Sequence, residues 1–112
     1  MNDTTRPPGK TTIAPDVLLT IAKMTALSVN GVSRMSSISG GFNRLFKRGS
    51  GDGVRIEIEN GTVFADLYVV LNKDVNIREV SRNIQHEVSR AISDMVGMDV
   101  GRINIHIDDI SY

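Results

Sequence analysis

The fold is decided by residues 53–110, GVRIEIENGTVFADLYVVLNKDVNIREVSRNIQHEVSRAISDMVGMDVGRINIHIDDI. Aliphatic residues occupy every second position in residues 54–59 and again in residues 63–71. This period of two places one aliphatic row of each segment on one face of a sheet. Asn60-Gly61 lies between the two runs. This pair predicts a two-residue hairpin turn, because both positions of a type I′ turn need a positive φ.

The turn also fixes which residues face each other across the hairpin. Counting outward from Asn60-Gly61 places Arg55 opposite Asp66, a pair of opposite charge that stabilises neighbouring strands. The aliphatic residues of both strands then share one face, and a slip of one residue would expose the whole row.

A long helix follows the hairpin. Asn76 is the expected N-cap, with Glu79 three residues later to complete a capping box and Val75 and Val80 forming a hydrophobic staple. Gly97 is the expected left-handed residue after the helix. The apolar stripe has spacings of three and four and comprises Ile77, Val80, Ile84, Val88, Ala91, Ile92 and Met95. Residues 102–110 then alternate as a half-buried strand.

The N-terminal half contributes one more helix and one more strand. Pro15 and Asp16 suit the first turn of a helix, and Asn30-Gly31 ends it. Its predicted apolar stripe comprises Val17, Leu18, Ile21, Ala22, Thr25 and Val29, widened by Met24 and Leu27. Residues 32–38 are expected to form a short strand.

We therefore predict one α+β domain with the order α-β-β-β-α-β, in which two helices pack on one face of a small mixed sheet. The domain is expected to span residues 11–112, after a flexible polar tail at residues 1–10 and with a flexible loop at residues 39–53. A chain of 112 residues is long enough for one independent core.

Composition excludes several classes of site and location. The chain has no cysteine, so disulfides, thiolate nucleophiles and cysteine-ligated metals are excluded. No apolar run approaches the length of a membrane span, and the N-terminus lacks the apolar core of a secretory signal. A cytoplasmic location is the resulting expectation.

The net charge of zero hides an asymmetry. Residues 1–50 carry seven basic and two acidic groups, whereas residues 51–112 carry six basic and eleven acidic groups. This division favours head-to-tail self-association if the two halves stay apart in the fold, and it cancels if they intermix.

Two stretches are candidate partner contacts. The first is the loop, where apolar and basic side chains lie between glycines: Phe42, Arg44, Leu45, Phe46, Lys47 and Arg48. The second is the half-apolar second face of the hairpin, which carries Phe64, Tyr68 and Val70. Either the loop packs into its own domain, or it docks a partner, an anionic surface or another copy.

No catalytic, cofactor or metal site is expected. His106, Asp108 and Asp109 are not expected to converge as three ligands on one metal ion, and the serines have no identifiable general base. The carboxylates of Glu57, Glu59 and Asp66 are expected to form a solvated face. The order of elements is also found in some RNA-binding domains, but the basic G-x-x-G loop of the KH type is missing, so nucleic acid is a poorly supported partner.

Four ordered motifs indicate a family. They are I-A…A-L-x-V-x-G-V in residues 13–32, D-L-Y-V-V in residues 66–70, N-I-x-E-V…N-I-Q in residues 76–85, and G-M-x-V-x-x-I-N-I-H-I in residues 97–107. Together they resemble the bacterial alkaline-shock, or Gls-type, envelope stress response family over about residues 11–110.

The resemblance implies a non-enzymatic protein of cell-envelope homeostasis that acts through self-association and partner docking. It implies a cytoplasmic protein, and some relatives self-assemble and are held at the membrane by a separate membrane-anchored partner. Some relatives are tied instead to lipid metabolism, so a regulator of lipid metabolism is an alternative, as is an RNA-binding module. The family has no agreed catalytic residues to carry over to this chain.

The hairpin turn can be tested directly. Replacing Asn60 or Gly61 with valine should destabilise the fold by about 1 kcal/mol or more, because β-branched residues resist a positive φ. Thermal melting of each variant measures the change, and an unaltered melting temperature would contradict the turn.

Overall fold

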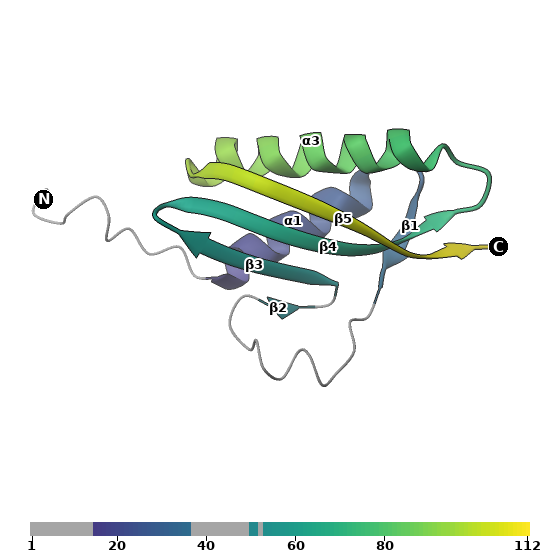
Figure 1. Cartoon of the computed structure of the whole chain (residues 1–112), viewed down its shortest axis with the longest axis horizontal. Coiled ribbons are helices and arrows are strands. Elements are labelled where there is room, and N and C mark those ends of the chain that lie inside the picture. The colour runs from purple at the N-terminus through teal and green to yellow at the C-terminus, as the bar shows by residue number, and fades with distance from the viewer. Residues whose placement is uncertain (1–14, 37–49, 52) are drawn as a thin grey trace, which may run out of the picture.

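The computed structural model describes residues 15–36, 50–51 and 53–112 (Figure 1). In chain order the elements are α1 (Pro15–Ser28), β1 (Val32–Met35), β2 (Ser50–Gly51), β3 (Val54–Glu59), β4 (Thr62–Asn72), α3 (Ile77–Val96) and β5 (Asp99–Ser111). The α+β class and the predicted order are confirmed, with β2 as a two-residue addition. The predicted tail and most of the 39–53 loop lie outside the described residues.

Strand β4 is the centre of the sheet. One of its edges pairs in parallel with β5 along the whole length of β4. Its other edge pairs antiparallel with β3 over residues 62–67 and with β1 over residues 69–71. The short β2 adds to the outer edge of β3. The five-stranded sheet is therefore mixed, as predicted, with three strands paired to β4 and β2 paired to β3 (Figure 1).

The hairpin between β3 and β4 has the predicted turn and register. Asn60 and Gly61 have φ values of 52° and 78°, which satisfies the positive φ that a type I′ turn requires. Arg55 pairs with Asp66 and Ile56 pairs with Ala65, as counted from the turn.

Helix α3 has both predicted ends. The backbone N–H of Glu79 donates to Asn76 Oδ1 at 3.0 Å, and Gly97 has a φ of 70° with its N–H bonded to the carbonyl of Ser93. Ile77 and Met95 are nevertheless 47% and 70% exposed. They lie in the first and last turns, so the core ends before the predicted apolar stripe does.

The buried side of α1 differs from the predicted stripe. Leu18, Ala22 and Val29 are buried as expected, but Ala26 completes the buried row and Val17 is 44% exposed. Because α1 is apolar on almost every side, its sequence pattern does not select a face. The small alanines face the core, where close approach to neighbouring elements is needed.

Both helices cover the same face of the sheet. A single buried cluster joins the inward residues of the two helices to those of the strands, and it includes Leu18, Ala26, Ile84, Val88, Val63, Leu67 and Leu71. The turn after α1 also fits tightly against α3: a Cβ on Gly31 would lie 2.8 Å from Val80 Cγ2. The predicted packing of two helices on one face is confirmed.

Helix α3 also shields the outer edge of β5. Gln85 Nε2 donates to the carbonyl of Ile103 at 3.0 Å, and α3 runs along β5 in Figure 1. An uncovered edge of 13 residues would present unpaired backbone groups to other chains. Among the described elements, α3 therefore covers this edge while both helices lie on one face of the sheet.

The N-cap provides a stability test for α3. Asn76→Ala should reduce the free energy of unfolding by about 1 kcal/mol, because the N–H of Glu79 loses its acceptor. Urea denaturation measures the change. Asn83→Ala, at an exposed position inside the same helix, is the matched control and should cost little. Equal effects in the two variants would contradict the cap.

Candidate functional site

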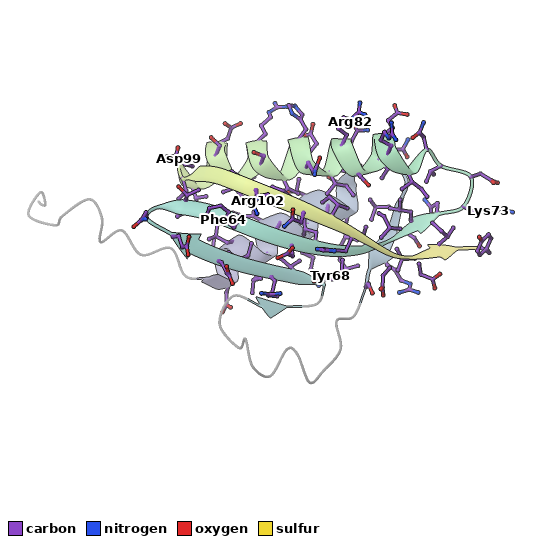
Figure 2. All side chains as sticks on the ribbon, in the orientation of Figure 1. Phe64, Tyr68, Lys73, Arg82, Asp99 and Arg102 are labelled. Atoms are coloured by element: carbon purple, nitrogen blue, oxygen red, sulfur yellow. The ribbon has the colours of Figure 1, made fainter. Side chains whose placement is uncertain are left out.

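The strands leave one face of the sheet uncovered by the described helices. We call this the open face; it comprises Arg55, Glu57, Phe64, Asp66, Tyr68, Arg102, Asn104 and His106. These residues alternate with the buried row, so the same backbone that forms the core presents them on the opposite side. Figure 2 labels Phe64, Tyr68 and Arg102 on the strands.

Phe64 lies at the hairpin end of the open face, where it pairs with Glu57 on one side and Arg102 on the other. Its ring occupies the space over Gly101: a Cβ there would approach Phe64 Cε1 to 2.4 Å. The pairing of β4 with β5 shifts register at this point, as it does where a bulge inserts a residue. Because Gly101 has no side chain, the Phe64 ring can lie half-buried against the sheet.

A connected cluster occupies the middle of the open face. The rings of Tyr68 and His106 stack with centroids 4.3 Å apart and planes at 10°. His106 Nε2 lies 2.9 Å from Asp66 Oδ1, and Asn104 Nδ2 donates to the same oxygen at 3.1 Å. Two strands thus hold one aromatic ring and one carboxylate in fixed positions.

Asp66 keeps its charge in this cluster. Partial burial by itself would raise the pKa of Asp66, but hydrogen bonds from His106 and Asn104 and the charges of His106 and Arg55 lower it below its ordinary value. The open face therefore carries a fixed negative charge beside Tyr68.

Beside Phe64 there is a depression of about 340 Å³. Charged, amide and apolar groups line it together: Glu57, Glu59, Phe64, Ala65, Asp66, Arg102 and Asn104. Arg55 and Glu57 form an ion pair at 3.6 Å along its rim. Aromatic anchors within a polar, charged rim are typical of surfaces that bind other proteins.

Val70 is a correction to the predicted contact surface. It lies on the same side of β4 as Phe64 and Tyr68 but is only 1% exposed. Val70 has strands on both sides, pairing with Arg34 of β1 and Asp109 of β5. Ser36, the residue after β1, donates a hydrogen bond from its Oγ to Asp108 of β5. Asp108 is the residue skipped where the register shifts at Val70, so this bond crosses β4 beside Val70, which is not available for contact.

The other predicted contacts divide between two regions. Phe64 and Tyr68 lie on the open face, whereas Phe42, Arg44, Leu45, Phe46, Lys47 and Arg48 lie outside the described residues. Of the seven basic groups in residues 1–50, the structure describes Lys23 and Arg34, so head-to-tail self-association through the charge asymmetry stays a prediction.

The two acidic residues of the candidate metal site, Asp108 and Asp109, have other hydrogen-bond partners. Asp108 accepts from Ser36, and Asp109 accepts the backbone N–H of Ile110 at 2.8 Å. Within residues 15–36, 50–51 and 53–112, no three His, Cys, Asp or Glu side chains converge on one point. The described helices include none long and apolar enough to cross a membrane.

The stacked cluster was missed by sequence reasoning. Its members come from β4 and β5. The two hydrogen-bonded pairs join residues that are 38 and 40 positions apart in the sequence. Tyr68 lies opposite His106 only in the observed parallel register. The alternation in each strand indicated the face of each residue but not its neighbour.

The cluster predicts a pH-dependent contribution to stability. Because the pKa of folded Asp66 is lowered, its contribution is present above the ordinary value of 3.8 and is lost as the pH falls through the folded value. The difference in unfolding free energy between the wild type and Asp66→Asn should therefore shrink as the pH is lowered from neutral to below 3.8. Denaturation at each pH measures it.

Asp94→Asn is the control for this prediction. Asp94 is 69% exposed and forms a long surface pair with Arg90, so its replacement should have little effect at either pH. A difference for Asp66→Asn that stays constant with pH would contradict the lowered pKa.

Comparison with known proteins places the chain among relatives of similar length. "Uncharacterized protein YqhY" of Bacillus subtilis is 31% identical over 106 residues, covering 93% of this chain and 78% of that protein. "Uncharacterized protein Spy1535" of Streptococcus pyogenes serotype M6 is 36% identical over 105 residues, covering 91% and 79%.

Solved structures show the same fold in a more distant protein. A variant of MamM CTD matches with a TM-score of 0.52 at 13% identity, covering 84% of this chain and 95% of that one. A nickel form of another variant matches equally well at 12% identity. At this level of identity the likeness concerns the fold alone.

The sequence model of the alkaline shock protein family, described by its cell envelope-related function, matches residues 3–112. This match extends over the four motifs identified in the sequence, and it agrees with the relatives of 31% and 36% identity. The chain therefore belongs to the alkaline shock protein family, whose function is related to the cell envelope.

Proposed function

We propose that this chain serves the cell envelope as a non-enzymatic stress response protein that binds a partner protein on its open face and self-associates. The observation that carries the proposal is the open face itself, where Phe64 and Tyr68 lie half-buried among charged groups and no described helix covers them. Its envelope role follows from the family.

Preorganisation supports binding on this face. Tyr68 is stacked on His106, and the Phe64 ring lies over Gly101, so neither ring loses much rotamer freedom when a partner arrives. Ordering a rotamer-rich side chain when a complex forms costs about 0.5–1.5 kcal/mol. A side chain that is already ordered in the free protein avoids part of this cost. Rigid aromatic groups of this kind are frequent hot spots of protein interfaces.

The charges of the open face favour a protein partner over nucleic acid. Arg55 and Arg102 are interspersed with the carboxylates of Glu57, Glu59 and Asp66. A nucleic-acid surface needs a dominant basic patch to replace the counterions of the phosphates, whereas mixed charges suit the polar rim of a protein interface.

The chemistry of the cluster supports a binding role over catalysis. Asp66 and His106 bond to each other, and Asn104 bonds to the same carboxylate oxygen, so these groups hold the two strands in place. We further propose that the protein acts in the cytoplasm and reaches the membrane through a membrane-anchored partner, as the resemblance to alkaline-shock proteins implies.

Partner capture tests this function. Three baits are compared in a detergent-solubilised envelope fraction: the wild type, Tyr112→Ala and Tyr68→Ala. The wild type and Tyr112→Ala should retain the same partner protein, and Tyr68→Ala should not retain it. Tyr112 is the matched control, because it is 94% exposed and lies at the C-terminus outside the open face. Quantitative mass spectrometry measures the retained protein, and a loss of about tenfold or more is expected, as for the truncation of an interface hot spot.

Equal retention by Tyr68→Ala and the wild type would contradict docking on the open face. Loss in both tyrosine variants would show that binding is not specific to this face. Circular dichroism must show that both variants are folded as the wild type is.

A further inference from the structure

The side of α1 that faces away from the core is apolar. Val17, Met24 and Leu27 are 44%, 65% and 40% exposed, and Thr20 between them is also exposed. The four residues are spaced by three, four and three, so they lie along one line of the helix. We call them the outer stripe. The buried row of Leu18, Ala22 and Ala26 lies on the opposite side.

The other helix shows what a solvent-facing side looks like in this fold. The exposed side of α3 carries several charged groups, namely Arg78, Glu79, Arg82, Arg90 and Asp94. Helix α1 has two charged residues in its 14, Asp16 and Lys23. A surface helix normally places polar residues away from the core, so the outer stripe has the composition of a side that becomes covered.

The spacing and charge of α1 point to a second copy of the chain as the cover. Residues 17, 20, 24 and 27 occupy the a and d positions of one and a half heptads, the pattern by which one helix packs along another. Such a seam is complementary to itself under a two-fold axis. Asp16 and Lys23 cancel, so two copies of α1 meet without net electrostatic repulsion.

The length of α1 sets the strength of such a contact. Fourteen helical residues span about 21 Å, so two paired helices bury an area at the low end of specific interfaces, below about 1,200 Å² in total. A contact of this size gives a reversible dimer that forms at high protein concentration. It is smaller than the interface of an obligate dimer.

We propose that the outer stripe of α1 pairs with the outer stripe of a second copy to form a weak two-fold dimer. This inference rests on the self-association in the proposed function and assigns it to one surface. Because α1 packs on the core side of the sheet, behind the strands in Figure 1, the dimer leaves both open faces free for partners.

Sedimentation velocity over a concentration series from about 1 µM to about 1 mM, the range of weak complexes, tests the dimer. The wild type should shift reversibly from monomer to dimer. Met24→Lys should remain monomeric, because a charge in the seam would be buried unpaired. Met95→Lys is the matched control: Met95 is 70% exposed on α3, outside the stripe, and its variant should dimerise as the wild type does.

Cysteine cross-linking locates the contact. The chain has no native cysteine, so the variant Thr20→Cys with Met24→Cys places thiols only in the outer stripe. Mild oxidation should link two chains in either orientation of the paired helices. A parallel pair brings equal positions together, and an antiparallel pair brings position 20 of one chain to position 24 of the other. Met95→Cys should give a much lower yield.

The outcomes separate this inference from the proposed function. A wild type that stays monomeric at about 1 mM overturns the dimer, as does a Met24→Lys variant that dimerises normally. Either result leaves partner capture on the open face standing. Dimers lost in Tyr68→Ala would move self-association to the sheet and also overturn the inference. Binding of a monomeric wild type to zwitterionic phospholipid vesicles, abolished in Met24→Lys, would assign the stripe to a membrane surface instead.

Discussion

The rest of the structure depends on the burial of one side of β4. Its inward residues, Val63, Ala65, Leu67, Val69 and Leu71, are each at most 1% exposed, and both helices pack over them. Since side chains alternate across a strand, burying this row forces Phe64, Asp66 and Tyr68 to the other side. The open face is therefore a direct consequence of the core, and β5 and β3 supply its two flanks.

Local rules explain what could be predicted from the sequence. The positive φ required at Asn60-Gly61 fixed the hairpin register, and the cap at Asn76 and the glycine at position 97 fixed the ends of α3. Each of these depends on residues close together in the chain. The family motifs were equally visible because they are ordered hydrophobic patterns within single elements.

What could not be predicted depends on neighbours from distant parts of the chain. The stacking of Tyr68 on His106 requires the parallel register of β4 with β5, which shifts near Gly101 and again near Asp108. Val70 is buried beside the hydrogen bond between Ser36 and Asp108, which come from segments on either side of β4. The buried side of α1 was ambiguous because an almost uniformly apolar helix offers no contrast between its faces.

The two layers of the fold suit two kinds of contact. The sheet presents rigid aromatic rings within a charged rim, and α1 presents an apolar seam on the side of the helices. A reversible dimer would join two open faces in one particle, and two linked sites raise the effective affinity for a clustered partner without any new contact. Weak self-association and partner binding would then reinforce each other at the envelope.

The central claim is that the open face is occupied by a protein at the cell envelope. Hydroxyl-radical footprinting tests it most directly, by comparing the purified chain with the chain in an envelope-containing extract. Oxidation of Tyr68 and His106 should fall severalfold in the extract, while oxidation of Tyr112, which is 94% exposed, should be unchanged. Equal oxidation of Tyr68 and His106 in both samples would contradict the claim.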